Sequence, residues 1–408
     1  MSRGRKTAAA LVVVTLLAAT AACGDDDSDE ASQPSGSGNE SGGGELQLDD
    51  PVKVVLLAET TGESEVAVPF LADGAQMAID ELNADGGVGG RDVEYERVSA
   101  PLDGAQAETA LLTAVEEEPT AMLGLPSSGQ VLAVAQRVGD AQIPMLYGAT
   151  AEQALVGADD SIANDFGFLL RPPQREISGA LVRFVGESLG IENIGLICVN
   201  NPFGDAGCGV AETTAEEIGA NIVASETVEQ DATDFSSTVV ELRDAGAEAV
   251  VSYVFPNAVG AVHNALADND LDVPHISGSS SLIAFTGAIT SGNFDNLYGV
   301  DDCAPGAEDD AAANEWAAAF EEEFGYPANY LAAEAYDGVK LIAAAVEAAG
   351  SSEPAAVRDA IAEISYDGVC DDYRGEPSQG LNHKVVAVSF AGEQVSAEET
   401  YELEDYGS

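Results

Sequence analysis

Two adjacent serines, Ser127 and Ser128, stand in the stretch GLPSSGQ (residues 124–130), between an apolar run and an amphipathic one. They could form a catalytic nucleophile, an anion cradle or a helix cap. The apolar run predicts a strand, and the periodic residues after it predict a helix. Free N–H groups at a helix start attract a carboxylate, and a hydroxyl adds a donor. The stretch therefore favours an anion cradle, with Ser128 as a further donor or only as the N-cap.

Catalysis by a serine would need a nearby base. His275 precedes a run of serines at 279–281, so a serine hydrolase stays a remote alternative. No nucleophile elbow, with a G-x-S-x-G serine between a strand and a helix, occurs, and no S-x-x-K motif fits. We therefore expect a protein that is not an enzyme and needs no cofactor.

The chain has five cysteines. If four of them form two disulfides, the protein works in an oxidising compartment, because disulfides persist there. With Cys23 assigned to the N-terminal segment described below, Cys198 and Cys208 form the preferred disulfide, and Cys303 and Cys370 pair by elimination. A metal site is not expected, because no CxxC occurs and the three histidines are far apart in the sequence.

The N-terminus has the pattern of an export signal. Three basic residues precede the apolar run 11–22, which is too short to span a bilayer. Small residues before Cys23 resemble a bacterial lipobox, so we expect a lipoprotein signal peptide over 1–22 and lipidation of Cys23. Residues 23–50 are acidic and rich in Gly and Ser, which predicts a disordered, lipid-anchored linker.

The formal net charge is −57. Such a chain would be repelled by nucleic acid phosphates and by anionic lipid, so both are excluded as partners. We expect contact with the membrane only through the lipid on Cys23, and a monomer.

Short apolar runs alternate with helix-period segments from residue 52 to 148, and the alternation restarts between 177 and 277. This βαβ repetition predicts an α/β fold with two doubly wound, mostly parallel sheets. Further helices are predicted at 311–325, 329–350 and 353–364. Ligands of open α/β sheets bind at the carboxyl ends of strands, where GLPSSGQ lies.

Several segments together resemble the type I periplasmic binding proteins, in particular the branched-chain amino acid (Leu/Ile/Val) binding group of ABC importers. These segments are LLAETTG (56–62), DGAQMAIDELNADGGVGGRDVEYE (73–96), LGLPSSGQVLAVAQ (123–136), IPMLYGAT (143–150), TDFSSTVVELRDAGAEAVV (233–251) and NYLAAEAYDGVKLIAAAVEAAG (329–350). The resemblance implies two lobes joined by a three-strand hinge: residues 51–172 plus 304–367, and residues 173–303 plus 368–405. Cys303 and Cys370 would then lie at crossovers, where a disulfide would pin the hinge.

The resemblance also implies site residues. In the first lobe, Ser127, Gly148, Ala149 and Thr150 match positions that hold the ligand's carboxylate. In the second lobe Phe203 replaces the usual tyrosine.

The ammonium-binding half of the site departs from the family. Ser279 lies near the place of the family's acid, and no Asp or Glu occurs between Asp272 and Asp295. Glu59 and Tyr253 are further candidate contacts. Because an unpaired buried ammonium is costly, we predict that a zwitterionic branched-chain amino acid is not the best ligand.

The predicted function is that of an extracytoplasmic solute-binding lipoprotein that delivers a small amino-acid-like or carboxylate or amide solute to an ABC permease. A sensory module that reports the ligand to a signalling partner is the alternative.

Overall fold

The computed structural model describes residues 46–58, 68–155, 164–278, 289, 294, 296–392 and 394–403. The predicted signal peptide, Cys23, Glu59 and Ser279 lie outside the described residues. Within the described part of the chain, no helix is long and apolar enough to cross a membrane.

The first sheet has five parallel strands in the order β2-β1-β3-β4-β5. They are β1 Val52–Leu57, β2 Val93–Val98, β3 Ala121–Gly124, β4 Met145–Tyr147 and β5 Gly167–Leu169. Alternate side chains of β1 enter two different core clusters: Val54 and Leu56 face one, and Val55 and Leu57 face the other. Both faces of this sheet are therefore covered, as the apolar runs predicted.

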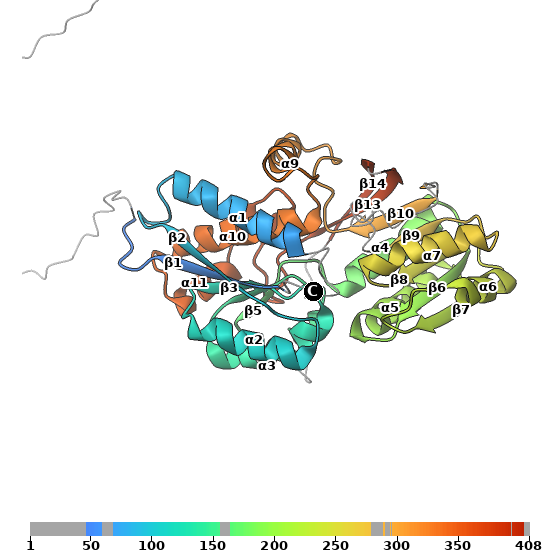
Figure 1. Ribbon diagram of the computed structural model, residues 1–408, viewed down its shortest axis with the longest axis horizontal. Helices are drawn as coiled ribbons and strands as arrows, with labels where there is room; N and C mark the ends of the chain where they lie inside the picture. Colours follow the sequence, from blue (N-terminus) through green and yellow to red (C-terminus); the bar gives the residue numbers. More distant parts are fainter. Residues whose placement is uncertain are drawn as a thin grey trace, which may run out of the picture. The chain divides into compact units, whose positions relative to one another are not determined.

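Helices from distant parts of the chain cover one face of the first sheet. Helix α1, Val68–Ala84, packs beside α10, Tyr330–Ala349 (Figure 1). Their backbones approach so closely that a Cβ on Gly74 would lie 2.1 Å from the carbonyl oxygen of Ala332. The same cluster holds residues of α9, Ala311–Phe324, and α11, Pro354–Ala362. The other face carries α2, Gly104–Glu116, and α3, Ser128–Ala141, followed by a short 3-10 turn, Glu152–Ala154.

The second sheet has seven strands in the order β14-β13-β10-β9-β8-β6-β7. They are β6 Asn193–Val199, β7 Asn221–Val228, β8 Ala249–Tyr253, β9 His275–Ser277, β10 Leu297–Asp301, β13 Lys384–Ala391 and β14 Gln394–Glu402. Strand β13 runs antiparallel to β10 and β14, so this sheet is mixed. A tight hairpin joins β13 to β14, and a parallel pair would have required a crossover.

Helices also cover both faces of the second sheet, because residues of β6 and β8 divide between two core clusters. The helices are α4 Gln174–Arg183, α5 Pro202–Ile218, α6 Ser236–Ala245 and α7 Pro256–Asp268. A π turn, Phe184–Ser188, extends α4. Helix α4 thus begins three residues before residue 177, where the sequence pattern restarts, and Gln174 lies in its first turn.

In the residues that the structure describes, the chain passes between the two sheets three times: after β5, after β10 and before β13. Leu169 exchanges backbone hydrogen bonds with Gln379 (2.9 Å) and Leu381 (3.0 Å), which ties the first crossover to the third. Tyr373, on the strand pair β11 Ser365–Asp367 and β12 Asp372–Arg374, packs with Leu381 in the core of the first sheet. The predicted lobe ranges stay a prediction, and this packing favours a last boundary after Leu381 rather than after residue 367.

Both predicted disulfides are present. Cys198 at the end of β6 is bonded to Cys208 in α5, and Cys303 after β10 is bonded to Cys370 between β11 and β12. The second disulfide links the second crossover to the segment that leads into the third.

Candidate functional site

The GLPSSGQ segment forms the turn from β3 into α3. Ser127 is the N-cap of α3, and its backbone N–H donates to Oε1 of Gln130 at 3.2 Å. Ser128 is already the first helical residue and is buried, so the prediction that it serves as the N-cap is wrong. The positive end of α3 is present where the sequence placed the anion cradle.

The loop after β4 is tied to the loop after β3. The N–H of Gly148 donates to the carbonyl oxygen of Gly124 at 2.7 Å. Because this N–H is already bonded within the protein, a ligand would accept hydrogen bonds from other donors of the Gly148–Thr150 segment. Ala149 and Thr150 are both buried.

Thr150 contacts the first turn of α4. Its hydroxyl donates to Oε1 of Gln174 at 2.5 Å, and its carbonyl oxygen accepts from the N–H of Gln174 at 2.9 Å. Both side chains are buried. The predicted carboxylate contact is therefore linked to the helix that starts the second part of the chain.

A small pocket of about 20 Å³, the room of roughly one water molecule, brings together three of the predicted residues, Thr150, Phe203 and Tyr253. Gly278, the neighbour of the predicted Ser279, also lines it. The remaining walls come from residues that the sequence did not single out: Arg171, Gln174, Ile177 and Leu181. None of the described residues that line this pocket is Asp or Glu, and Ser127 and Ser128 do not line it.

Aromatic rings form one wall of the pocket. Phe203 lies in the first turn of α5, whose N-cap Asn201 accepts from the N–H of Gly204 at 3.0 Å. The Phe203 ring stacks on Phe255 with centroids 6.3 Å apart and meets Tyr253 edge-on. Tyr253 is buried and its phenol lies beside the Ser178 hydroxyl. Burial raises the pKa of Tyr253 above its ordinary value, so the phenol stays a neutral donor.

Arg171 is the one cation among the described lining residues, and its charge is already paired. The guanidinium forms two hydrogen bonds to Asp302, at 2.5 and 2.8 Å, and lies over the Tyr330 ring at 4.6 Å. Glu334 lies 3.4 Å away. Burial, with Asp302 beside it, raises the pKa of Glu334 well above its ordinary value, so one carboxylate balances one guanidinium.

His275 does not form a catalytic pair with the candidate serines that the structure describes. It is on β9, fully buried, with Nε2 2.8 Å from the hydroxyl of Ser252 and its ring stacked on His263. Ser252 is fully buried as well, so no substrate can reach this pair. The segment GESLG (186–190) does have G-x-S-x-G spacing, but it spans the π turn after α4 rather than a strand-to-helix turn.

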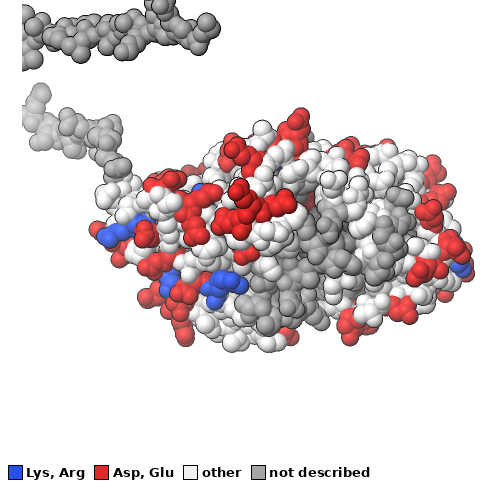
Figure 2. Space-filling model, turned by 45° about the horizontal axis from the view of Figure 1, so that its top comes forward, with Lys and Arg blue, Asp and Glu red and all other residues white. Residues whose placement is uncertain are grey.

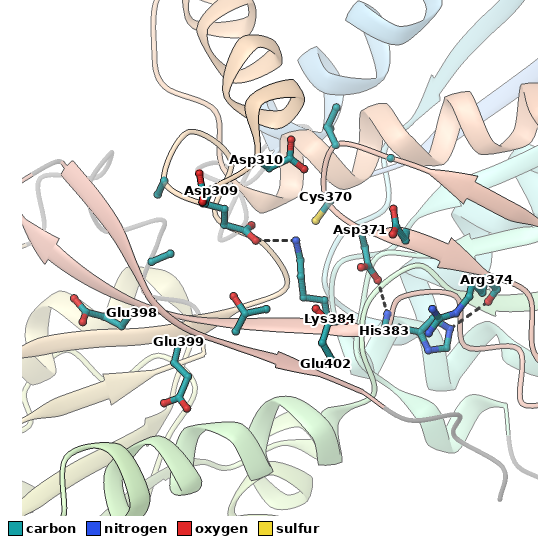
Figure 3. A pocket seen from close by; sticks show the side chains of 17 residues that line it. Asp309, Asp310, Cys370, Asp371, Arg374, His383, Lys384, Glu398, Glu399 and Glu402 are labelled. Carbon is teal, nitrogen blue, oxygen red and sulfur yellow. Dashed lines mark hydrogen bonds and ion pairs between the residues drawn. The ribbon is translucent and has the colours of Figure 1, made fainter.

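A second pocket lies beside the hinge disulfide (Figure 3). Carboxylates from three segments line it, among them Asp309, Asp371, Glu399 and Glu402. Lys384 crosses it to pair with Glu308 at 2.8 Å. Within the residues that the structure describes, no group of His, Cys, Asp and Glu could hold a metal ion. Apart from Cys370, this pocket contains none of the predicted residues.

Comparison with known proteins identifies the class. A family model described as periplasmic binding protein matches residues 51–393. The chain therefore belongs to the periplasmic binding protein family. This membership confirms the resemblance and places the protein outside the cytoplasm.

Relatives point to one group within this family. A Leu/Ile/Val-binding protein homolog of Brucella abortus is 30% identical over 199 residues, which cover 46% of this chain and 47% of the relative. The chain thus spans about half the length of this relative. A leucine-, isoleucine-, valine-, threonine- and alanine-binding protein of Pseudomonas aeruginosa is 23% identical over 324 residues, or 78% of this chain and 84% of the relative.

Solved structures share the fold. A branched-chain amino acid transporter substrate binding protein of Streptococcus pneumoniae, in complex with isoleucine, aligns with a TM-score of 0.78 and 22% identity over 86% of this chain and all of that chain. A solute binding protein of Rhodopseudomonas palustris, in complex with 3,4-dihydroxybenzoic acid, aligns with a TM-score of 0.77 and 16% identity over 88% of this chain and 99% of that one. These neighbours and relatives are binding proteins, so the expectation that the chain is not an enzyme is confirmed.

Proposed function

We propose that the protein is the lipid-anchored solute-binding component of an ABC importer, which binds a small carboxylate, amide or amino-acid-like solute between two lobes and delivers it to a permease. One observation carries the proposal: Thr150, after the first sheet, and Phe203 and Tyr253, of the second, line one pocket. A ligand bound there contacts both lobes, so it stabilises an arrangement in which they close on it.

The proposed contacts divide between the lobes. Thr150, which lines the pocket, takes the carboxylate. Ser127 and Ala149 do not line the pocket and stay predicted contacts, at the start of α3 where the helix offers positive potential. Phe203 and Tyr253 cover the ligand from the other side. Ser128, Gly148, Glu59 and Ser279 stay predicted contacts.

The ligand is proposed not to be a zwitterionic branched-chain amino acid. The described pocket wall has no carboxylate that could pair with an ammonium group, and its cation is paired already. Two structural neighbours from Rhodopseudomonas palustris hold 3,4-dihydroxybenzoic acid and 4-hydroxybenzoate, which carry a carboxylate and no ammonium. Their pockets show that this fold accepts such solutes.

A screen of solutes tests the proposed function. The protein without its lipid is titrated calorimetrically with amino acids, amides, ureas, short carboxylates and aromatic acids, after a thermal-shift survey. We expect saturable one-to-one binding of a carboxylate or amide, and weaker binding of leucine. Sub-micromolar binding of leucine would contradict the proposed ligand class, and no binding across the whole panel would contradict the function.

The anchor is tested separately. The proposed lipid on Cys23 holds the acidic domain at the membrane. Figure 2 shows that Asp and Glu are spread over the face in view, with few Lys or Arg. Such a surface has no attraction for anionic lipid. Replacing Cys23 by alanine should therefore move the protein from the membrane fraction to the soluble fraction. Unchanged membrane association would contradict lipidation at this residue.

A further inference from the structure

Gln174 lies in the middle of a row of uncharged polar side chains that lines and backs the small pocket. Thr150 donates to its Oε1 at 2.5 Å, and its Nε2 donates to Ser178 at 2.7 Å. The Ser178 hydroxyl lies beside the phenol of Tyr253. Each of these four side chains is buried, Gln174 with only 2% of its surface exposed. The row thus runs from the first-sheet loop to the end of a second-sheet strand.

The amide of Gln174 has hydrogen-bonding capacity left for a solute. A primary amide has two N–H donors and an oxygen with two lone pairs. The bonds to Thr150 and Ser178 use one N–H and one lone pair. Gln174 lines the pocket, and we take the remaining N–H and lone pair as the groups that a ligand there would contact.

The surroundings of Gln174 disfavour a positively charged ligand group. It is the first residue of α4, where the helix has its positive end. No described residue that lines this pocket is an acid, and the one cation, Arg171, is already paired with Asp302. An ammonium group here would find only neutral partners in a poorly solvated site, which is costly.

We propose that Gln174 is a specificity-determining residue that contacts the solute through its amide. At this end of the pocket, Gln174 selects a neutral or anionic hydrogen-bonding group over an ammonium group. This inference rests on the proposed function. It names a residue absent from the sequence-derived site, and it predicts that one isosteric change alters the class of solute.

The test is the variant Gln174→Glu, which keeps the shape and adds one negative charge. Both hydroxyl neighbours can rotate to donate to the new carboxylate, so the row stays hydrogen-bonded. The full-length wild type and variant are titrated with isoleucine and with 4-hydroxybenzoate. A charge-assisted hydrogen bond to the ammonium should strengthen isoleucine binding at least about tenfold, and repulsion should weaken 4-hydroxybenzoate by a similar factor.

Two further variants are matched controls. Gln153→Glu adds the same charge at an exposed residue outside this pocket and should leave both affinities within about twofold, because surface charges are screened. Gln174→Met removes the amide without adding charge, so it should weaken 4-hydroxybenzoate and leave isoleucine no tighter than in the wild type.

The outcomes separate the inference from the function it rests on. Folded Gln174→Glu that binds isoleucine no tighter than the wild type overturns the inference. If only Gln174→Met folds, unchanged affinities for both probes overturn it. A wild type that binds no solute of the whole panel contradicts the proposed function, whereas a wild type that binds a solute and ignores both Gln174 changes contradicts only the role of Gln174.

Discussion

The guanidinium of Arg171 and the carboxylate of Asp302 form a two-point ion pair, with Nε–Oδ2 at 2.5 Å and Nη2–Oδ1 at 2.8 Å. Arg171 lies in the first crossover between the sheets and Asp302 in the second. Both side chains are at most 9% exposed. Because the pair joins two hinge segments where water does not reach, it fixes the geometry around which the lobes would move.

Removing the cation of this pair should destabilise the protein strongly. Arg171→Met leaves the buried Asp302 carboxylate without its partner, which costs about 3–5 kcal/mol of unfolding free energy. Urea denaturation measures the loss. Lys53→Met, which breaks an ion pair whose Glu117 side chain is 45% exposed, is the control and should cost less than about 1 kcal/mol. Equal losses of unfolding free energy for the two variants would show that the buried pair stabilises the protein no more than an exposed one.

The two disulfides should contribute unequally to stability. Cys303–Cys370 closes a separation of 67 residues and Cys198–Cys208 one of 10. Loop entropy then predicts that replacing both cysteines by alanine costs about 4 kcal/mol for the longer loop and about 3 kcal/mol for the shorter. Unfolding of the two double variants under non-reducing conditions tests the order. A larger loss for the short loop would contradict the entropic account.

His275 should make the protein sensitive to acid. Burial, with His263 beside it, lowers the pKa of His275 well below its ordinary value. As the pH falls below about 6.5, the imidazole of the unfolded chain binds a proton while the buried imidazole of the folded chain stays neutral. The free energy of unfolding therefore falls with the pH in this range.

The variant His275→Asn removes this titration. Its stability relative to the wild type should rise as the pH falls from 7.5 to 4.5, by up to about 1.4 kcal/mol per pH unit. Urea midpoints across this range give the comparison, because other titrating groups cancel in the difference. A difference independent of pH would mean that His275 takes up its proton without unfolding.

Truncation of Phe203 should weaken binding of whichever solute the screen identifies. Phe203→Ala removes a ring that covers the pocket and stacks on Phe255, and the expected loss is at least about tenfold in affinity. Leu112→Ala, at a side chain that is 53% exposed on α2, is the control and should bind as the wild type does. Wild-type affinity in Phe203→Ala would remove this residue from the site.

The sequence predicted the parts of the fold that depend on local periodicity. The first strand begins at residue 52, and the helices predicted at 311–325 and 329–350 lie where the apolar spacing placed them, within a few residues. It missed β5, β10, β11 and β12, of which β11 (SYD) and β12 (DYR) carry hardly any apolar pattern. The antiparallel direction of β13 against β10 depends on how the chain returns from the helices before it, which no local signal encodes.

The site was predicted less completely. Thr150 and Phe203, which the family resemblance implied, meet in one pocket with Tyr253, which was proposed from its place at a strand end, and their contact with a solute stays a prediction. Arg171 and Gln174 were missed, since their roles arise from contacts with Asp302 and Thr150 that are distant in sequence or across a crossover. Helix α4 begins at Gln174, three residues before the pattern restarts at residue 177. The periodic pattern therefore did not mark Gln174 as the first residue of a helix.

The central claim is that a solute between the lobes draws them together. Small-angle X-ray scattering of the protein, with and without the solute that calorimetry identifies, tests this most directly. We expect a smaller radius of gyration with the solute bound and no change with a solute that does not bind. An unchanged radius at saturating concentration of a confirmed ligand would contradict it.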